Sequence, residues 1–439
     1  MGFGHTIEAP ARRASVRAVP ATPRLSRRAG LWAVAFAFLA VAAFSTAPSP
    51  LYGLFAHRDH LSSLTVTFAY AVYAVGVVVS LVLAGHVSDW YGRRVVLLPA
   101  IAVAVVAAVL FLLWRSLAGL LAARVLTGVA LGAAVATATA YIADLDAGPG
   151  GATTRRAGIV ATVANIGGLA CGPLIAGLLA RDDAHGLTLP FQVFLAALVL
   201  AGLAVLLAPE GHPPLHPRPR YRPQRLSVPP RARRQFAAAA AGVGLCFAVL
   251  GLFAGLAGMF LAGPLHHPGP ALVGVTIFLS FGAGAVAQTT TTGWAPQRLI
   301  AAGIAAALIG LAVLVASAWT APPSLALFEI AGIVAGAGSG AIFRGSLSTV
   351  ILTSGPDDRA GVLATFFTAG YAGLSVPVIG LGLLLQHLSP RVTLLIFALV
   401  VGLGLLAAAP ILVRQHDSGD PCPPPDARRP GRPLQHAQT

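Results

Sequence analysis

Three charged residues lie within otherwise apolar stretches of the sequence. Glu329 is the only acidic residue well inside such a stretch, and Arg124 and Arg344 are the only arginines placed in this way. A charge in an apolar environment is costly unless it faces a cavity or a partner, and desolvation favours the neutral form of a carboxyl group. We therefore predict that Glu329 takes up and releases a proton and that Arg124 tunes this protonation.

Two other arrangements fit the same residues. Glu329 and Arg124 can form a static ion pair that joins the two halves of the chain, or either can lie at the lipid interface. Arg344 follows Glu329 by about four helical turns. We interpret Arg344 as an inner gate or a packing contact rather than a substrate ligand.

The decamer GHVSDWYGRR, which begins at Gly85, is a second polar cluster between apolar stretches. Gly85 lets helices approach closely, Gly92 permits a tight turn, and Asp89 can accept hydrogen bonds from the N-terminus of a neighbouring helix. Arg93 and Arg94 can pair with acidic groups that exchange partners during a movement. An ordinary basic loop explains only the arginines, so we predict a loop that takes part in conformational gating.

The composition indicates which solvent surrounds these groups. Hydrophobic residues make up 56% of the 439 positions, charged residues make up 10%, and the mean hydropathy is +0.81. Soluble domains contain about 25% charged residues, so we predict an integral membrane protein. A helix needs about 20 apolar residues to cross a bilayer. Twelve windows meet this need: 31–54, 64–84, 95–114, 117–143, 157–180, 190–208, 236–262, 271–292, 298–318, 324–352, 360–386 and 391–413.

Three of these windows leave an alternative count open. Pro48 and Pro50 interrupt the first window, and only a short link around Trp294 separates the eighth from the ninth. A count of eleven spans would place the C-terminus outside.

The distribution of arginine predicts the orientation in the membrane. All 29 basic residues are arginines, and 23 of them fall in inner segments if the N-terminus is inside. The outer loops then hold four: Arg58, Arg115, Arg181 and Arg391. Because cytoplasmic loops carry an excess of basic residues, we expect both termini in the cytoplasm. The basic runs lack interleaved aromatic residues, so we expect them to contact the lipid bilayer and not nucleic acid.

The chain divides into five segments. They are a basic tail at 1–30, a six-helix bundle at 31–208, a Pro- and Arg-rich linker at 209–235, a second six-helix bundle at 236–413 and a Pro-rich tail at 414–439. The run LLAARVLTGVALGAA from Leu120 and the run LALFEIAGIVAGAGSG from Leu325 are faintly alike. Such symmetry is expected where two bundles enclose a central site. We therefore predict an all-α polytopic protein of two pseudo-symmetric bundles.

Several residue patterns argue against an enzyme, a cofactor or a metal site. Cys171, Cys246 and Cys422 have no paired spacing, and the adjacent His266 and His267 are expected to be exposed in an outer loop. A chain without lysine has no phosphate-binding loop of the kind that an ATP-driven pump needs. Arginine in place of lysine and alanine-rich spans suggest a GC-rich bacterial genome, which favours the bacterial cytoplasmic membrane.

The fifth window contains a candidate hinge. Gly168 and Gly172 let helices touch, while Pro173 frees a carbonyl group and bends the helix. We predict a packing hinge between the two halves, with ordinary small-residue packing as the alternative.

A central cavity is less clearly marked. Its candidate lining residues are Tyr70, Tyr73, Asn165, Gln288 and Phe367. So few polar groups within the spans favour a hydrophobic or amphipathic small molecule over a sugar or a polyanion.

The decamer resembles the loop signature of the major facilitator superfamily, Gly-x-x-x-Asp-x-x-Gly-Arg followed by Arg or Lys. The run from Arg124 to Gly128 is similar to the family's Arg-x-x-x-Gly pattern, with Thr127 in place of the usual glutamine. GLACGPLIAG in the fifth window resembles the signature of proton-driven exporters, with Ala176 where a glycine is usual. The corresponding link in the second half, GWAPQR, lacks the aspartate, which puts a symmetric gate in doubt.

This resemblance implies the major facilitator fold and alternating access, in which two bundles rock around a central site. We expect a monomeric secondary transporter that exports a hydrophobic or amphipathic small molecule, with protons as the coupling ion. Proton-coupled uptake of a small metabolite is the alternative.

Overall fold

A computed structural model describes residues 25–85, 87–147, 154–181, 185–211, 221, 223–229, 232–355 and 358–413. Helices are the regular structure of this part of the chain, and twelve helical segments are long and apolar enough to cross a membrane. Within lipid the main chain must satisfy its own hydrogen bonds, which an apolar segment achieves as a helix. The prediction of an all-α protein with twelve spans is confirmed.

The helices have the following bounds. The first half contains α1 (Arg27–Thr46), η1 (Ser49–Leu51), α2 (Tyr52–Asp59), α3 (Ser63–Ala84), α4 (Val87–Tyr91), α5 (Arg93–Leu113), α6 (Leu117–Asp146), α7 (Arg155–Thr162), η2 (Val163–Gly167), α8 (Gly168–Leu179) and α9 (Leu189–Leu207). The second half contains α10 (Arg233–Ala262), α11 (Pro270–Thr290), α12 (Pro296–Trp319), α13 (Leu325–Thr353), α14 (Arg359–Leu384) and α15 (Pro390–Val413).

The structure resolves the three doubtful windows in favour of twelve spans. Pro48 and Pro50 break the first helix, but η1 and α2 continue it, so the segment Arg27–Asp59 forms one span. The eighth and ninth windows form separate helices, α11 and α12. Gly293 lies in the turn between them with a φ of 100°, a conformation that favours glycine.

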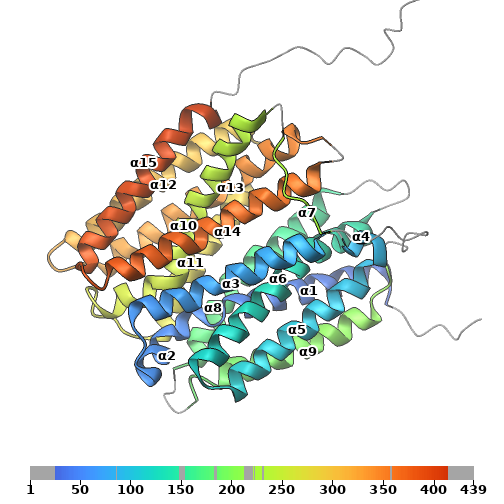
Figure 1. Cartoon of the computed structure of the whole chain (residues 1–439), viewed down its shortest axis with the longest axis horizontal. Coiled ribbons are helices and arrows are strands. Elements are labelled where there is room, and N and C mark those ends of the chain that lie inside the picture. Colours follow the sequence, from blue (N-terminus) through green and yellow to red (C-terminus); the bar gives the residue numbers. More distant parts are fainter. Residues whose placement is uncertain are drawn as a thin grey trace, which may run out of the picture.

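The two halves repeat one packing pattern. In the first half α1 packs on α6, α8 and α9, and in the second half α10 packs on α13, α14 and α15. Likewise α3 packs on α6, and α11 packs on α13. Figure 1 shows the two bundles, blue to green and yellow to red, lying against each other. The faint sequence symmetry therefore corresponds to a repeated helix arrangement.

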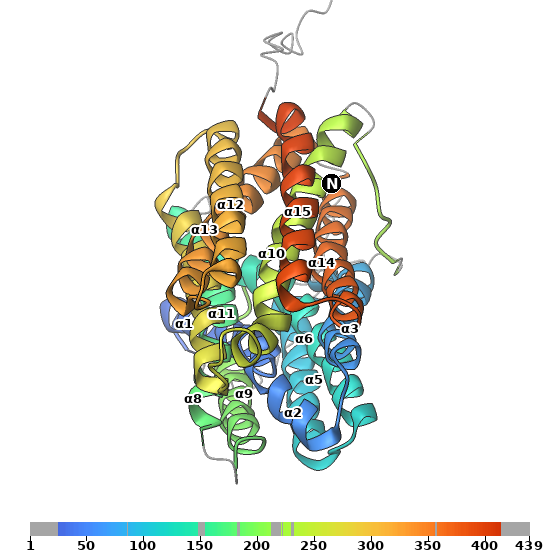
Figure 2. The same ribbon diagram turned by 90° about the vertical axis from the view of Figure 1, so that its left-hand side faces the viewer.

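The bundles meet along two pairs of helices, α3 with α14 and α8 with α11 (Figure 2). We call the side of the molecule that carries Gly85 and the residues 223–229 the linker side, and the opposite side the far side. The hydroxyl group of Ser63 donates to the carbonyl oxygen of Gly382 over 3.1 Å on the far side. A Cβ atom at Gly177 would overlap the carbonyl oxygen of Pro270 there. On the far side the bundles therefore approach each other closely enough for contacts with main-chain atoms.

Residues of the linker bridge the same helices on the linker side. The main-chain N–H of Gln224 donates to the carbonyl oxygen of Val82 in α3 over 2.8 Å. Thr365 of α14 donates through its hydroxyl group to the carbonyl oxygen of Ser227 over 2.9 Å. Residues 224–227 therefore lie between α3 and α14 at this end.

Candidate functional site

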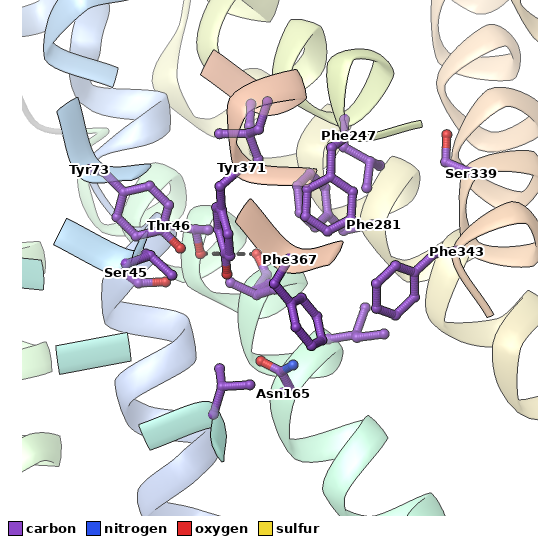
Figure 3. A pocket seen from close by; sticks show the side chains of 18 of the residues that line it. Ser45, Thr46, Tyr73, Asn165, Phe247, Phe281, Ser339, Phe343, Phe367 and Tyr371 are labelled. Carbon is purple, nitrogen blue, oxygen red and sulfur yellow. Dashed lines mark hydrogen bonds between the residues drawn. The ribbon is translucent and has the colours of Figure 1, made fainter. Parts of the chain in front are cut away.

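A cavity lies between the two bundles. It contains about 1080 Å³ of space that no protein atom fills, part of it continuous with open solvent. Seven aromatic residues line it, namely Tyr70, Tyr73, Phe247, Phe281, Phe343, Phe367 and Tyr371. In Figure 3 the rings of Tyr73 and Tyr371 face each other from α3 and α14. Their centroids are 6.2 Å apart in an edge-to-face arrangement that joins the bundles.

The structure places all five candidate cavity residues on the wall of this cavity: Tyr70, Tyr73, Asn165, Gln288 and Phe367. Sequence reasoning missed four of the aromatic residues, Tyr371, Phe247, Phe281 and Phe343. Tyr371 follows Phe367 by four positions, which places both on one face of a helix. That spacing was a usable signal, whereas Phe247 and Phe343 belong to helices with no comparable mark.

Arg124 is 1% exposed and also lines the cavity. Its guanidinium group donates to three main-chain oxygens: to Ser45 over 2.7 Å, and to Ala69 and Tyr70 over 3.4 Å each. It also lies over the ring of Tyr73, 4.6 Å from the centroid. Because these partners are neutral, they hold the guanidinium group in place without cancelling its charge.

Glu329 is half-buried between α13 and α11, away from the residues that line the cavity. Its Oε1 lies 2.5 Å from the hydroxyl oxygen of Thr276, and its Oε2 has no hydrogen-bond partner. Among the described residues, the ion pairs are those of Arg58 and Arg93, so Glu329 and Arg124 form no static pair in this conformation. The two predicted coupling residues are not brought together.

Arg344 lies in the linker-side half of α13 and is half-buried. Its guanidinium group donates to the carbonyl oxygen of Gln288 and, over 3.3 Å, to the hydroxyl group of Thr292. Both partners belong to α11 or the turn after it, in the same bundle. These bonds join α13 to the linker-side end of α11, next to the cavity residue Gln288.

The decamer forms a network with residues of the first bundle and of the start of the linker. Arg93 is 8% exposed and pairs with the carboxylates of Asp89 and of Asp144, the latter over 2.9 Å. The carboxylate of Glu210 accepts from the main-chain N–H of Arg93 over 2.8 Å at the start of α5. Glu210 therefore fills the helix-capping role that we expected of Asp89.

The other members of the decamer have separate roles. Gly92 has a φ of 100°, as the predicted tight turn requires. Gly85 ends α3, and its main-chain N–H donates to the carbonyl oxygen of Leu81 in its own helix. Arg94 donates through its side chain to the carbonyl oxygen of Leu206 over 3.1 Å rather than to a carboxylate.

No cluster of three or more His, Cys, Asp or Glu residues suited to a metal ion occurs in the ranges that the structure describes. Within those ranges, Cys171 and Cys246 are free thiols. Cys422 lies outside the described residues.

Comparison with known proteins identifies the family. The profile described as Major Facilitator Superfamily matches residues 34–374, which is more than half of the chain. The chain belongs to the major facilitator superfamily. It is therefore a secondary transporter of the membrane, and the resemblance found in the signature motifs is confirmed.

Solved structures share the fold at low sequence identity. A mutant of the peptide transporter POT, in complex with sulfate, has a TM-score of 0.70 at 13% identity and covers 88% of this chain and 95% of its own. A mutant of the nucleoside transporter NupG has a TM-score of 0.65 at 13% identity, with 87% and 99% covered. The human organic anion transporter MFSD10 has a TM-score of 0.61 at 17% identity, with 89% and 100% covered. No curated protein sequence matches the chain.

The exporter-like signature of this superfamily member packs in two directions. Cβ atoms at Gly168 and Gly172 would overlap the backbone of α1 in the same bundle. The carbonyl oxygen of Pro173 instead meets Gly274 of α11 in the other bundle. The glycine pair is therefore a contact within one bundle, which corrects our expectation, whereas the proline lies at the junction of the two.

Pro173 also frees a carbonyl group, as predicted. A proline cannot donate to the residue four positions earlier, which here is Leu169. The hydroxyl group of Thr46 in α1 donates to this oxygen over 3.0 Å. The π-helical turn η2 precedes the same segment and is a further local distortion of the fifth span.

Gly128 of this superfamily member lets α6 touch α3. A Cβ atom there would overlap the carbonyl oxygen of Tyr73, and Gly76 has the same relation to Val125. The close crossing places Tyr73 and Arg124 beside each other at the cavity.

Proposed function

We propose that the protein moves a hydrophobic or amphipathic small molecule across the membrane by alternating access, driven by protons. The observation that carries this proposal is the aromatic cavity between the bundles, beside helix pairs that are in contact on the far side. Aromatic side chains provide a large apolar contact area with few polar demands on a ligand.

The linker side is the cytoplasmic side in this proposal. Arg93, Arg94, Arg155 and Arg298 all lie at helix starts on that side, and basic residues concentrate on the cytoplasmic face of membrane proteins. The contacts of the far side then close the cavity toward the outside. The conformation is inward-facing, and both termini are cytoplasmic.

Glu329 is the site of proton binding in this proposal. The hydroxyl oxygen of Thr276 lies within hydrogen-bond distance of both Glu329 Oε1 and, at 3.0 Å, the carbonyl oxygen of Leu272. An ionised Glu329 accepts the hydroxyl proton, whereas a protonated Glu329 donates to the hydroxyl oxygen, which then donates to Leu272. The same pair of residues therefore accommodates both protonation states.

Thr276 also connects this carboxyl group to the junction of the bundles. It lies two residues from Gly274, which packs against Pro173 of the other bundle. A change of hydrogen bonding at Thr276 acts on α11 close to the contact that must open on the far side. This short path supports Glu329 as the coupling group, without a direct role for Arg124 in its protonation.

Export is the proposed direction, and the exporter-like segment with Pro173 at the bundle junction supports it. The test uses purified protein in liposomes with an imposed pH difference. The probes are naphthylacetate, its amide and the matching naphthylethylamine. An exchanger accumulates a probe in liposomes with an acidic interior, whereas a cotransporter needs an alkaline interior, whichever way the protein is inserted.

We expect accumulation above that of protein-free liposomes with the acidic interior. The protein-free liposomes are needed because a weak base enters acidic liposomes, and a weak acid enters alkaline ones, as the neutral species without a transporter. Protein-dependent accumulation only with the alkaline interior would support uptake by cotransport instead. No gradient-dependent movement of any probe would contradict the proposed coupling and solute class.

A further inference from the structure

We propose that the transported solute is an organic monoanion, with an aromatic body held between the bundles and one carboxylate paired with Arg124. This inference rests on the proposed transport function and adds the charge of the substrate to it. The sequence predicted only a hydrophobic or amphipathic small molecule, and this inference specifies its charge and the group that binds it.

Charge is the first line of support. Arg124 is the charged residue among those that line the cavity in the described part of the chain. None of the seven carboxylates of that part lines the cavity. Four of them are engaged elsewhere by side chains: Asp59 with Arg58, Asp89 and Asp144 with Arg93, and Glu329 with Thr276. A buried guanidinium group whose partners are all neutral favours an anion in the adjacent cavity.

The free hydrogen-bonding capacity of groups at the cavity is the second line of support. A guanidinium group carries five N–H donors, and Arg124 directs three hydrogen bonds to main-chain oxygens. The cavity-lining Ser49 and Ser339 are 5% and 0% exposed, and their hydroxyl groups have no hydrogen-bond partner. Ser49 follows Ser45, an Arg124 partner, by four positions. A carboxylate can accept from both the remaining N–H donors and such a hydroxyl group.

The aromatic wall of the cavity is the third line of support for an anion with an aromatic body. The ring of Phe247 lies 5.8 Å from that of Tyr371, which in turn faces Tyr73 across the bundle junction. Figure 3 shows these three rings next to one another, with Asn165 below them. These rings pack against one another and form a continuous aromatic wall, against which an aromatic body can lie by edge or face contacts.

The same wall disfavours a cation. Tyr70 and Tyr73 would be natural cation-binding faces, but the guanidinium group of Arg124 already lies over both, 6.0 and 4.6 Å from their centroids. A second positive charge would meet Arg124 without a carboxylate on the cavity wall to offset the repulsion.

The experiment compares three ligands of nearly the same shape: naphthylacetate, its primary amide and naphthylethylamine. Binding is measured by calorimetry on the purified protein, and counterflow is measured in liposomes. We expect the carboxylate to bind the wild-type protein on the order of tenfold more tightly than the amide, and the amine to bind most weakly. Arg124→Gln should remove the preference for the carboxylate, whereas Arg124→Lys should keep a weaker one.

Arg391→Gln is the matched control because Arg391 is an exposed arginine at the far-side end of α15. It should bind the three ligands as the wild type does. Equal binding of amide and carboxylate by the wild type would overturn the inference even if Arg124→Gln does not fold. A preference that persists in a folded Arg124→Gln protein would overturn it as well.

The two proposals fail in different ways. Counterflow of the amide or amine with no preference for the carboxylate leaves the transport proposal intact and removes the anion inference. Selective binding of the carboxylate without any counterflow keeps the anion site and contradicts the transport of such solutes.

Discussion

Gly274 of α11 packs against Pro173 of α8 so closely that a Cβ atom at position 274 would overlap the proline's carbonyl oxygen. This contact joins the two bundles on the far side. Its closeness depends on the absence of a side chain, because added volume at a well-packed contact has no room unless the backbones separate.

Gly274→Ala should therefore disfavour the conformation that is closed on the far side, by about 1–3 kcal/mol. We expect slower transport and a longer distance between spin labels at His60 and Leu388, exposed far-side positions in opposite bundles. Gly282→Ala is the control. Gly282 belongs to the same helix, and nothing lies within 4 Å of a Cβ atom at this position. An unchanged label distance in Gly274→Ala would show that this contact does not set the conformation.

The adjacent arginines of the signature loop should differ in importance. Arg93→Ala leaves the carboxylates of Asp89 and Asp144 without their partner, and the 24% exposure of Asp144 limits but does not remove the penalty. We expect the free energy of unfolding to fall by roughly 2 kcal/mol in Arg93→Ala and by less than about 1 kcal/mol in Arg94→Ala. Thermal unfolding in detergent measures both. An equal loss of stability in the two variants would contradict the greater importance of Arg93 in this network.

Replacement of Glu329 tests proton coupling. Glu329→Gln keeps the shape but cannot ionise, so we expect counterflow to continue while accumulation driven by a pH difference falls about tenfold or more. Thr276→Val should weaken coupling in the same direction, because valine cannot hydrogen-bond to either form of the carboxyl group.

Thr289→Val is the control for Thr276→Val, because the Thr289 hydroxyl group bonds only within its own helix. If gradient-driven accumulation were unchanged in Glu329→Gln, protons would have to couple at another group. A loss of both counterflow and accumulation would instead indicate a structural role.

The linker residues between α3 and α14 can be tested through Gly361. A Cβ atom there would lie 2.5 Å from the carbonyl oxygen of Arg225 and 2.6 Å from the hydroxyl oxygen of Ser227. Gly361→Ala should loosen the linker, so we expect trypsin to cut after Arg225 about threefold or more faster, since local release exposes the chain to a protease. Gly355→Ala, where nothing lies within 4 Å, should match the wild type in a mass-spectrometric time course. Equal cleavage rates in both variants would mean that Gly361 does not hold the linker.

The sequence alone determined the spans, the family and several local conformations. Apolar windows of sufficient length must become helices in lipid, because the main chain has no other hydrogen-bond partners there. Gly92 predicted its turn and Pro173 predicted a freed carbonyl, since these effects follow from the covalent structure of single residues.

Only the tertiary structure decided which residues meet. The partner of Arg93 at Asp144 is 51 positions away, and Thr276 and Glu329 are 53 apart. The helix faces could not be assigned from periodicity, because lipid and protein interior are both apolar and leave no polar stripe to mark the outside. For that reason the sequence identified Arg124 and Glu329 as unusual, but the fold separated them, placing one at the cavity and the other between α11 and α13.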